Sequence, residues 1–442
     1  MLGHFYRSLA RYAFFPYFIC ALAASFYLFE FAIRVAPSVM TNELMASFHI
    51  QSFGLGALAA CFFYVYTPMQ IPAGLLVDRF GPRLLLSLMM IICAFGCLVF
   101  SHTHSLWLAG IARAMMGFGS AFVYVSILVL ISRWCPPKQF AMLTGATQFL
   151  GALGAIAGEK PLSWAMHAYG WRSAVEFFFW LGLVMAAMMW LFIRDYAPGR
   201  KPLAHKRAPE RKHLGMEWKR LKVVLSHPQS WYIGAYGFTC WTAVAIFGTL
   251  WGVHYAQTVF NISAEQASGM ISVLWIGVAI SSPLIGWWSD KIQSRRIPLL
   301  ASSILGLAGT GVLFFMHDVS LSVAYVCVFL LGFAAGAQSV TFGLVRDINP
   351  AYTMGTASGF NNMAVILGAV IFQPLVGHML GWHWNHAMLH GAPVYAAAAY
   401  QHAMSVIPWI FVAGIVLTLF FIKETRCQNV VQPNHHHPFG GQ

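Results

Sequence analysis

Three charged residues lie within long apolar stretches of this sequence, where a charge is costly and is usually retained for function. Glu30 and Arg34 are four residues apart in the stretch 14–39, and Arg113 lies in the stretch 105–132. Residues four apart share one helix face, so this carboxylate and guanidinium can pair. An arginine at that depth can bind a carboxylate or phosphate through its fork of N–H donors. A glutamate there can carry a proton whose affinity the arginines tune.

Two interpretations of these residues stay open. Arg34 is either the counter-ion of an anionic substrate or a static partner of Glu30. Glu30 and Arg113 are predicted as proton-coupling residues, with a structural brace as the alternative for Arg113. Polar and aromatic residues near mid-span complete the predicted substrate site around Arg34: Gln148, Tyr64, Trp275, Asn361 and Asn362. Glu159 and Lys160, near the outer end of a later stretch, are interpreted as structurally paired at the rim.

Twelve long apolar stretches would hold these residues in a membrane. Hydrophobic residues make up 59% of the 442-residue chain and charged residues 9%, whereas soluble domains carry about 25% charged residues. Each stretch can cross a hydrocarbon core of about 30 Å, and backbone groups in lipid must pair within helices. The predicted fold is an all-α membrane protein with twelve transmembrane helices. No nucleophile–base set, cofactor loop or metal-ligand spacing stands out, so we expect no enzyme, cofactor or metal site.

The distribution of lysine and arginine predicts the orientation. With the N-terminus inside, 22 of the 26 lysine and arginine residues fall in inner segments, as the positive-inside rule requires. Both termini are then cytoplasmic, and the net charge of +13 reflects topology rather than nucleic-acid binding. We expect a monomer in the inner (cytoplasmic) membrane, whose partners are the lipid bilayer, protons and a small-molecule substrate.

One long polar segment divides the chain. Residues 194–228 hold ten basic residues and are predicted to be a cytoplasmic linker with a surface helix near Trp218. The flanking parts are an N-terminal six-helix bundle, residues 1–193, and a C-terminal six-helix bundle, residues 229–426. A cytoplasmic tail, residues 427–442, follows.

A glycine-containing loop motif carries a family resemblance. Residues 74–83 read GLLVDRFGPR, and residues 286–291 repeat the motif as GWWSDK at an offset of 212. Together with residues 113–119, RAMMGFG, they resemble two motifs of the major facilitator superfamily, whose two similar halves hold the substrate at the midplane. Gly81 allows a tight reversal, and an aspartate is favoured at a helix N-terminus. The resemblance implies an inner gate formed by Gly74, Asp78, Arg79, Gly81, Arg83, Asp290 and Lys291.

The first apolar stretch narrows the resemblance. Residues 27–34, YLFEFAIR, are similar to organic-anion symporters that place an arginine in the first helix, and residues 37–40, PSVM, resemble phagosomal nutrient transporters of intracellular bacteria. The seventh-helix arginine of phosphate-ester exchangers and the fifth-helix Gly-Pro pair of drug antiporters are missing. The resemblance implies a proton-coupled symporter that imports a small carboxylate-bearing nutrient, such as an amino acid or organic acid. Two alternatives stay open: an exporter of a siderophore or drug-like molecule, and a non-transporting membrane sensor.

Overall fold

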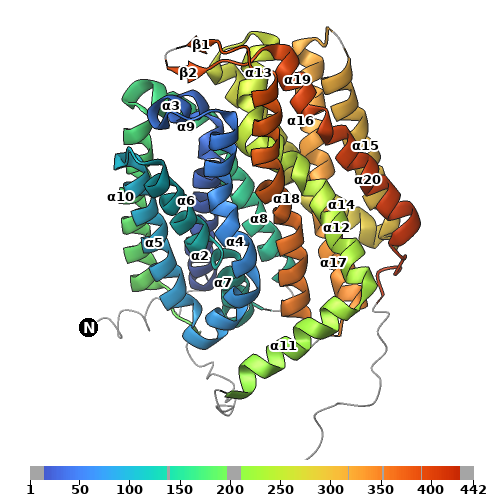
Figure 1. Cartoon of the computed structure of the whole chain (residues 1–442). Coiled ribbons are helices and arrows are strands. Elements are labelled where there is room, and N and C mark those ends of the chain that lie inside the picture. The colour runs from blue at the N-terminus through green and yellow to red at the C-terminus, as the bar shows by residue number, and fades with distance from the viewer. Residues whose placement is uncertain are drawn as a thin grey trace, which may run out of the picture.

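The chain folds into a bundle of long helices that run side by side (Figure 1). The computed structural model describes residues 14–136, 140–196, 211–316, 318–350, 353–389 and 391–428. Eleven helices of this described part are long and apolar enough to cross a membrane. The remaining span is the pair α8 (Phe140–Ala157) and α9 (Lys160–Tyr169). The predicted all-α fold with twelve spans is confirmed.

The first six spans form the N-terminal bundle. The fifth of these spans is the pair α8 and α9. The other five are α2 (Phe15–Val35) with η1 (Ala36–Ser38), α4 (Ser52–Phe80), α5 (Pro82–His102), α6 (Leu106–Ser120) with α7 (Val123–Trp134), and α10 (Trp171–Phe192). A short helix, α3 (Thr41–Phe48), connects the first two spans. Within this bundle α2 packs on α8, α4 on α6, and α5 on α10.

The last six spans form the C-terminal bundle. Its helices are α12 (Pro228–Ala243) with η3 (Val244–Trp251) and α13 (Gly252–Phe260), α14 (Ala264–Ile292), α15 (Arg296–Phe315), α16 (Leu321–Ala335) with α17 (Gln338–Ile348), α18 (Met354–Trp382), and α19 (Ala397–Met404) with α20 (Val406–Val416) and η5 (Leu417–Phe421). A hairpin of β1 (Met388–Leu389) and β2 (Ala392–Pro393) precedes α19. Here α12 packs on α18, α14 on α16, and α15 on α20, which repeats the pairing of the first bundle.

Equivalent glycines allow close helix crossings in both bundles. A Cβ on Gly117 of α6 would overlap the carbonyl oxygen of Phe62 on α4, and a Cβ on Gly332 of α16 would overlap that of Leu274 on α14. Phe62 and Leu274 are separated by the same 212 residues as the two loop motifs. Because helices in lipid associate through tight packing, the missing side chains set these crossings.

The two bundles meet along two pairs of spans. α4 packs against α18, and both α8 and α9 pack against α14. The helix α11 (Arg211–Ser226), which carries the exposed Trp218, lies across one end of the molecule, here called the linker end (Figure 1). The opposite end carries α3, α9 and the hairpin, and is called the distal end. The surface helix predicted in the linker is therefore present.

Candidate functional site

An ion pair on α2 occupies the interior of the N-terminal bundle. Arg34 donates a hydrogen bond from Nη2 to Oε1 of Glu30, one helical turn earlier. The Glu30 side chain is fully buried and that of Arg34 is 4% exposed. Within the described residues, Glu30 Oε2 and Arg34 Nε have no hydrogen-bond partner. The pair therefore keeps one acceptor and one donor for a ligand, because buried polar groups are normally paired.

Four aromatic rings, here called the aromatic cage, enclose the guanidinium of Arg34. Its Cζ lies 4.4 Å from the ring centroid of Phe31 and 4.8 Å from that of Tyr66. The centroids of Phe62 and Phe63 lie at 5.6 and 5.9 Å. These are cation–π distances, and the attraction strengthens when the charge is desolvated. The cage thus holds the guanidinium between α2 and α4.

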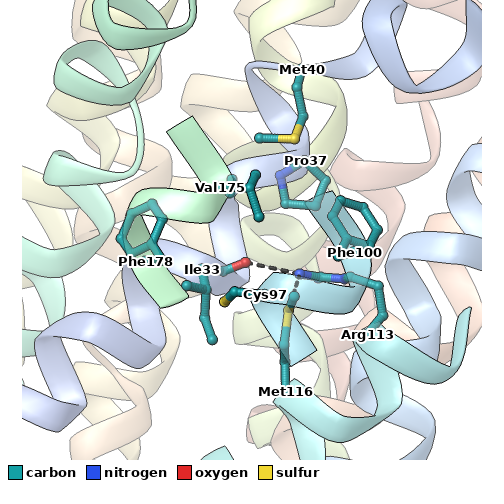
Figure 2. Close-up of a pocket in the computed structure, with 10 residues that line it drawn as sticks. Ile33, Pro37, Met40, Cys97, Phe100, Arg113, Met116, Val175 and Phe178 are labelled. Atoms are coloured by element: carbon teal, nitrogen blue, oxygen red, sulfur yellow. Dashed lines mark hydrogen bonds between the residues drawn. The ribbon is translucent and has the colours of Figure 1, made fainter. Parts of the chain in front are cut away.

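Arg113 enters the same region from α6 and has no acidic partner among the described residues. It donates from Nη1 to the carbonyl oxygen of Ile33 at 2.9 Å, and its Cζ lies 5.1 Å from the Phe62 ring centroid. The side chain is buried, and its Nε and Nη2 have no hydrogen-bond partner in the described part of the chain. Figure 2 shows Arg113 beside Cys97 and Met116 at a cavity of about 10 Å³, which is room for about one water molecule.

Gln148 and Trp275, two of the predicted substrate residues, border this cluster. Gln148 of α8 accepts a hydrogen bond at Oε1 from the hydroxyl of Tyr27 at 3.0 Å. Trp275 of α14 is fully buried, and its ring meets that of Phe31 at a centroid distance of 5.9 Å and 90°. Trp241 packs on the other side at 6.4 Å. Trp275 therefore brings the C-terminal bundle against the aromatic cage.

The other predicted substrate residues lie apart from the cluster. Asn361 is buried within the C-terminal bundle and donates from Nδ2 to the hydroxyl of Thr341 at 3.0 Å. Asn362 bridges the two bundles by donating from Nδ2 to Oε1 of Gln70 at 2.8 Å. Tyr64 is 46% exposed on α4. It is not among the rings that contact the Arg34 guanidinium.

Hydrogen bonds between the bundles close the distal end. Ser52, the first residue of α4, donates from Oγ to the carbonyl oxygen of Gly377 at 2.6 Å. The Ser52 N–H donates to the hydroxyl of Tyr395 at 3.0 Å. Nε2 of His254 lies 2.7 Å from Oδ1 of Asn42. A ligand in the cluster would therefore be shut off from the distal side.

Glu159 belongs to this closed region and is not paired with Lys160. It stands at the break between α8 and α9, its side chain is fully buried, and Oε1 accepts a hydrogen bond from Ser38 at 3.0 Å. Lys160 instead faces Glu265 of the C-terminal bundle, with Nζ 3.3 Å from Oε1. The interpretation of Glu159 and Lys160 as a rim pair is wrong, because the backbone break turns the two side chains in different directions.

The loop motif reverses the chain between α4 and α5 at the linker end. Gly81 has φ +82°, a conformation that favours glycine, as the sequence predicted. Asp195, just after α10, accepts the N–H of Arg83 at 2.9 Å. The Arg83 guanidinium donates to the carbonyl oxygen of Trp190 from Nη2 at 2.8 Å and stacks on its ring at 4.2 Å. Arg83 thus fastens α5 to α10.

The second copy of the motif carries a denser charge cluster. Arg295 donates from Nε to Oδ2 of Asp347 at 3.0 Å and from Nη1 to Oδ1 of Asp290 at 2.9 Å. Lys291 points elsewhere, and its Nζ lies 4.8 Å from the ring centroid of Trp287. The predicted gating residue Asp290 is therefore part of an ion-pair network that joins α14 to α17.

A carboxylate after the last span caps α15. Glu424 accepts the N–H of Arg295 at 2.9 Å, the N–H of Arg296 at 3.0 Å and the hydroxyl of Ser294 at 2.6 Å. Burial alone would raise the pKa of this carboxyl group. The N–H and hydroxyl donors outweigh burial and lower the pKa of Glu424 to about 2, as expected for a carboxylate that accepts several backbone hydrogen bonds.

Fewer contacts are described for the remaining predicted gating residues, Gly74, Arg79 and Asp78. A Cβ on Gly74 would meet no atom within 4 Å. The Cζ of Arg79 lies 5.2 Å from the ring centroid of Phe80. The side chain of Asp78 lies outside the described part of the chain.

Sequence reasoning missed four residues that join these elements: Ser38, Gln70, Asp195 and Glu424. Asp195 and Glu424 had a usable signal, because each acid follows the last span of its half and a helix N-terminus favours negative charge. Ser38 and Gln70 had none, since an uncharged polar residue in a span has no pattern that names its partner.

The two pseudo-symmetric bundles and the buried charge cluster between their spans define a multi-pass membrane transporter. The sequence pattern of the Major Facilitator Superfamily matches residues 14–373. The chain therefore belongs to this superfamily, and it is a transporter rather than an enzyme.

Three similar proteins cover most of the chain. The sodium-dependent phosphate transport protein 1 of Arabidopsis thaliana chloroplasts is 26% identical over 78% of this chain and 70% of its own length. The membrane sensor protein UhpC of Salmonella typhimurium is 24% identical over 85% of this chain and 87% of its own. The probable galactarate/D-glucarate transporter GudP of Escherichia coli is 21% identical over 87% of this chain and 90% of its own length. Two of these three names are those of anion transporters.

A solved structure has the same fold. The inward-facing, unoccupied form of a bacterial homologue of the human lysosomal transporter Spinster superposes with a TM-score of 0.75. It is 15% identical and covers 92% of this chain and 97% of its own. At this identity the likeness supports the arrangement of helices alone.

Proposed function

We propose that this protein is a proton-coupled symporter that imports a small carboxylate-bearing nutrient, an amino acid or an organic acid, across the inner (cytoplasmic) membrane. The charge of the buried cluster carries the proposal. Glu30 is its one carboxylate, whereas Arg34 and Arg113 are two guanidinium groups. The cluster thus has one net positive charge in surroundings where an unpaired charge costs several kcal/mol. An anionic substrate would supply the missing charge.

The unused donors of the cluster suit a carboxylate. Arg34 Nε and the Nε and Nη2 atoms of Arg113 lack partners among the described residues. A carboxylate offers two oxygens that accept such N–H groups in pairs. Gln148 and Trp275 are proposed to contact the rest of the substrate, because they border the cluster from α8 and α14.

Proton coupling is proposed to follow from competition for Arg34. A substrate carboxylate that pairs with Arg34 removes the partner of Glu30, and a buried carboxylate without a partner favours its neutral form. A proton on Glu30 in turn frees Arg34 for the substrate. Each ligand therefore strengthens the binding of the other, and such coupling is reciprocal.

Import is the proposed direction, and the orientation of the chain is part of the same proposal. The positive-inside rule places the linker end, with its basic residues, in the cytoplasm. We then assign Gly74, Asp78, Arg79, Gly81, Arg83, Asp290 and Lys291 to the cytoplasmic gate. Drug-type export is disfavoured because the fifth span carries no Gly-Pro pair.

Two measurements test the function in sequence. A thermal-shift screen of amino acids and organic acids identifies ligands, since a ligand stabilises the protein that binds it. Uptake of that ligand into proteoliposomes is then measured with and without an inward proton gradient. Accumulation driven by the gradient supports symport. Accumulation driven by an outward gradient would indicate an exporter, and binding without flux would indicate a sensor.

A further inference from the structure

Glu159 is a buried acid at the contact between the two bundles. It stands in the break between α8 and α9, and its backbone there is non-helical, with φ −100° and ψ −99°. Gly158 brings this break against α2, because a Cβ there would approach the carbonyl oxygen of Ala32 to 2.7 Å. The carboxyl group is consequently fixed beside η1, where Ser38 donates to its Oε1.

Among the described residues, no basic side chain forms an ion pair with this carboxyl group. Basic side chains of the described elements around it contact other groups: Arg34 pairs with Glu30, Lys160 faces Glu265, His167 contacts the Ser163 carbonyl and His254 contacts Asn42. Another acid of these elements, Glu43 of α3, would add negative charge rather than neutralise it. None of these bases lies within 4 Å of Glu159. A carboxylate with a single hydroxyl donor and no counter-charge is costly to bury, so the neutral acid is the form that suits this position.

Trp275 faces the acid from the C-terminal bundle. Its indole N–H and Glu159 Oε2 are both buried, and neither has a hydrogen-bond partner elsewhere in the described chain. The two groups lie close to each other across the interface, and no hydrogen bond joins them in this structure. Trp275 also packs on Phe31 of the aromatic cage. Glu159 therefore lies between Ser38 of one bundle and Trp275 of the other, on the distal side of the buried cluster.

We propose that Glu159 is a second proton-binding residue, whose neutral form holds the distal gate closed by joining Ser38 to Trp275. The proton binds to the carboxylate from the distal compartment as the gate closes, and it returns to that compartment when the gate opens. Loss of the proton creates a charge that water must solvate, and the bundles separate at this point. This proton is additional to the one on Glu30. This proposal depends on the proposed function in one respect: the distal side must open during the transport cycle.

The test measures the gate directly by electron–electron distance spectroscopy. Spin labels are placed at Trp164→Cys of α9, which is 62% exposed, and at Asn261→Cys, which ends α13 in the other bundle. Cys61 and Cys427, which are partly exposed, are changed to serine beforehand. Distances are recorded without substrate from pH 5 to pH 8. In the parent protein we expect the ratio of open to closed molecules to rise with pH, by up to about tenfold per unit for one proton.

Variants separate the acid from its neighbourhood. Glu159→Gln keeps a neutral amide at this position, so its distance distribution should stay closed at every pH. Glu176→Gln removes an acid whose side chain is 38% exposed and whose neighbour, His102, belongs to the same bundle, and it should keep the parent response. Trp275→Phe keeps the ring but loses the N–H donor, and should open at a lower pH than the parent.

Two results would overturn the proposal: a parent distribution that does not change with pH, or a Glu159→Gln protein that opens with pH as the parent does. If Glu159→Gln does not yield a monodisperse protein, the parent and Trp275→Phe measurements still decide. The distance measurement uses no substrate. Its outcome therefore remains valid even if the proteoliposome assay shows no proton-driven uptake. If the gate distances do not change with pH while proton-driven uptake is intact, only the proposed role of Glu159 is rejected, and the proposed symport function stands.

Discussion

Glu424 caps the start of α15 at Arg295 in the same way that Asp195 caps the start of α5 at Arg83, with carboxylate-to-N–H distances of 2.9 Å in both halves. Arg83 and Arg295 are equivalent in the repeat, whereas the two acids come from the chain segments that leave the sixth and twelfth spans. Each acid therefore links the last span of its bundle to the third. Carboxylates at a helix N-terminus also interact favourably with the helix dipole.

Glu424→Gln should lower the stability of the protein at neutral pH. The folded pKa of about 2 lies below the ordinary value of 4.5, so the carboxylate stabilises the fold fully above pH 4.5, and this contribution is lost as the pH falls towards 2. Solvent screening of this half-exposed group limits the effect to about 1–2 kcal/mol. Melting temperatures of both proteins in detergent should differ at pH 7 and converge near pH 2. An equal difference at both values would show that packing, not charge, is lost.

Glu30→Gln should uncouple substrate movement from protons. The amide cannot bind and release a proton, so gradient-driven accumulation should stop while exchange of labelled for unlabelled substrate continues. Proteoliposome uptake and counterflow measure the two activities. Glu176→Gln, at an acid with a 38% exposed side chain, should leave both unchanged. Accumulation by Glu30→Gln at the parent level would identify Glu30 as a structural partner of Arg34.

Arg34→Ala should abolish ligand binding and destabilise the fold. The change leaves Glu30 buried without a cation, which costs about 3–5 kcal/mol, and it removes the proposed anchor of the substrate. Thermal shift with the screened ligand should show a lower melting temperature and no shift on ligand addition. Arg172→Ala is the control, because Arg172 donates only to the Ser101 and Thr103 carbonyl oxygens among the described residues and lies outside the cluster. A ligand shift retained by Arg34→Ala would remove Arg34 from the site.

Gly117→Ala should destabilise the N-terminal bundle. The new methyl group would overlap the carbonyl oxygen of Phe62, and overpacking of this kind costs about 1–3 kcal/mol. Gly145→Ala is the matched control, since a Cβ there meets no atom within 4 Å and alanine favours a helix. Melting temperatures in detergent should therefore fall for Gly117→Ala and stay level or rise for Gly145→Ala. Equal stability of the two variants would mean that α4 and α6 separate easily.

More of the fold than of the candidate site could be predicted from the sequence. Length and hydropathy define the spans, and the offset between the loop motifs defines the repeat, because both are properties of neighbouring residues. The pairing of Glu30 with Arg34 was predictable for the same reason. The cap by Glu424, the bridge from Asn362 to Gln70 and the burial of Glu159 depend on contacts between distant spans. The exposure of Tyr64 on α4 was not predictable either, because an apolar span gives little sign of which helix face meets lipid.

The aromatic cage has a consequence for the order of events during binding. Phe31, Phe62, Phe63 and Tyr66 surround the Arg34 guanidinium, and the Arg34 side chain is only 4% exposed. An anion must shed its own hydration before it can reach that charge, and a compact inorganic ion holds its water most strongly. An organic acid can instead lay its carbon skeleton on the rings while its carboxylate alone is dehydrated. We therefore expect the protein to prefer organic anions with an apolar skeleton over compact inorganic anions of the same charge.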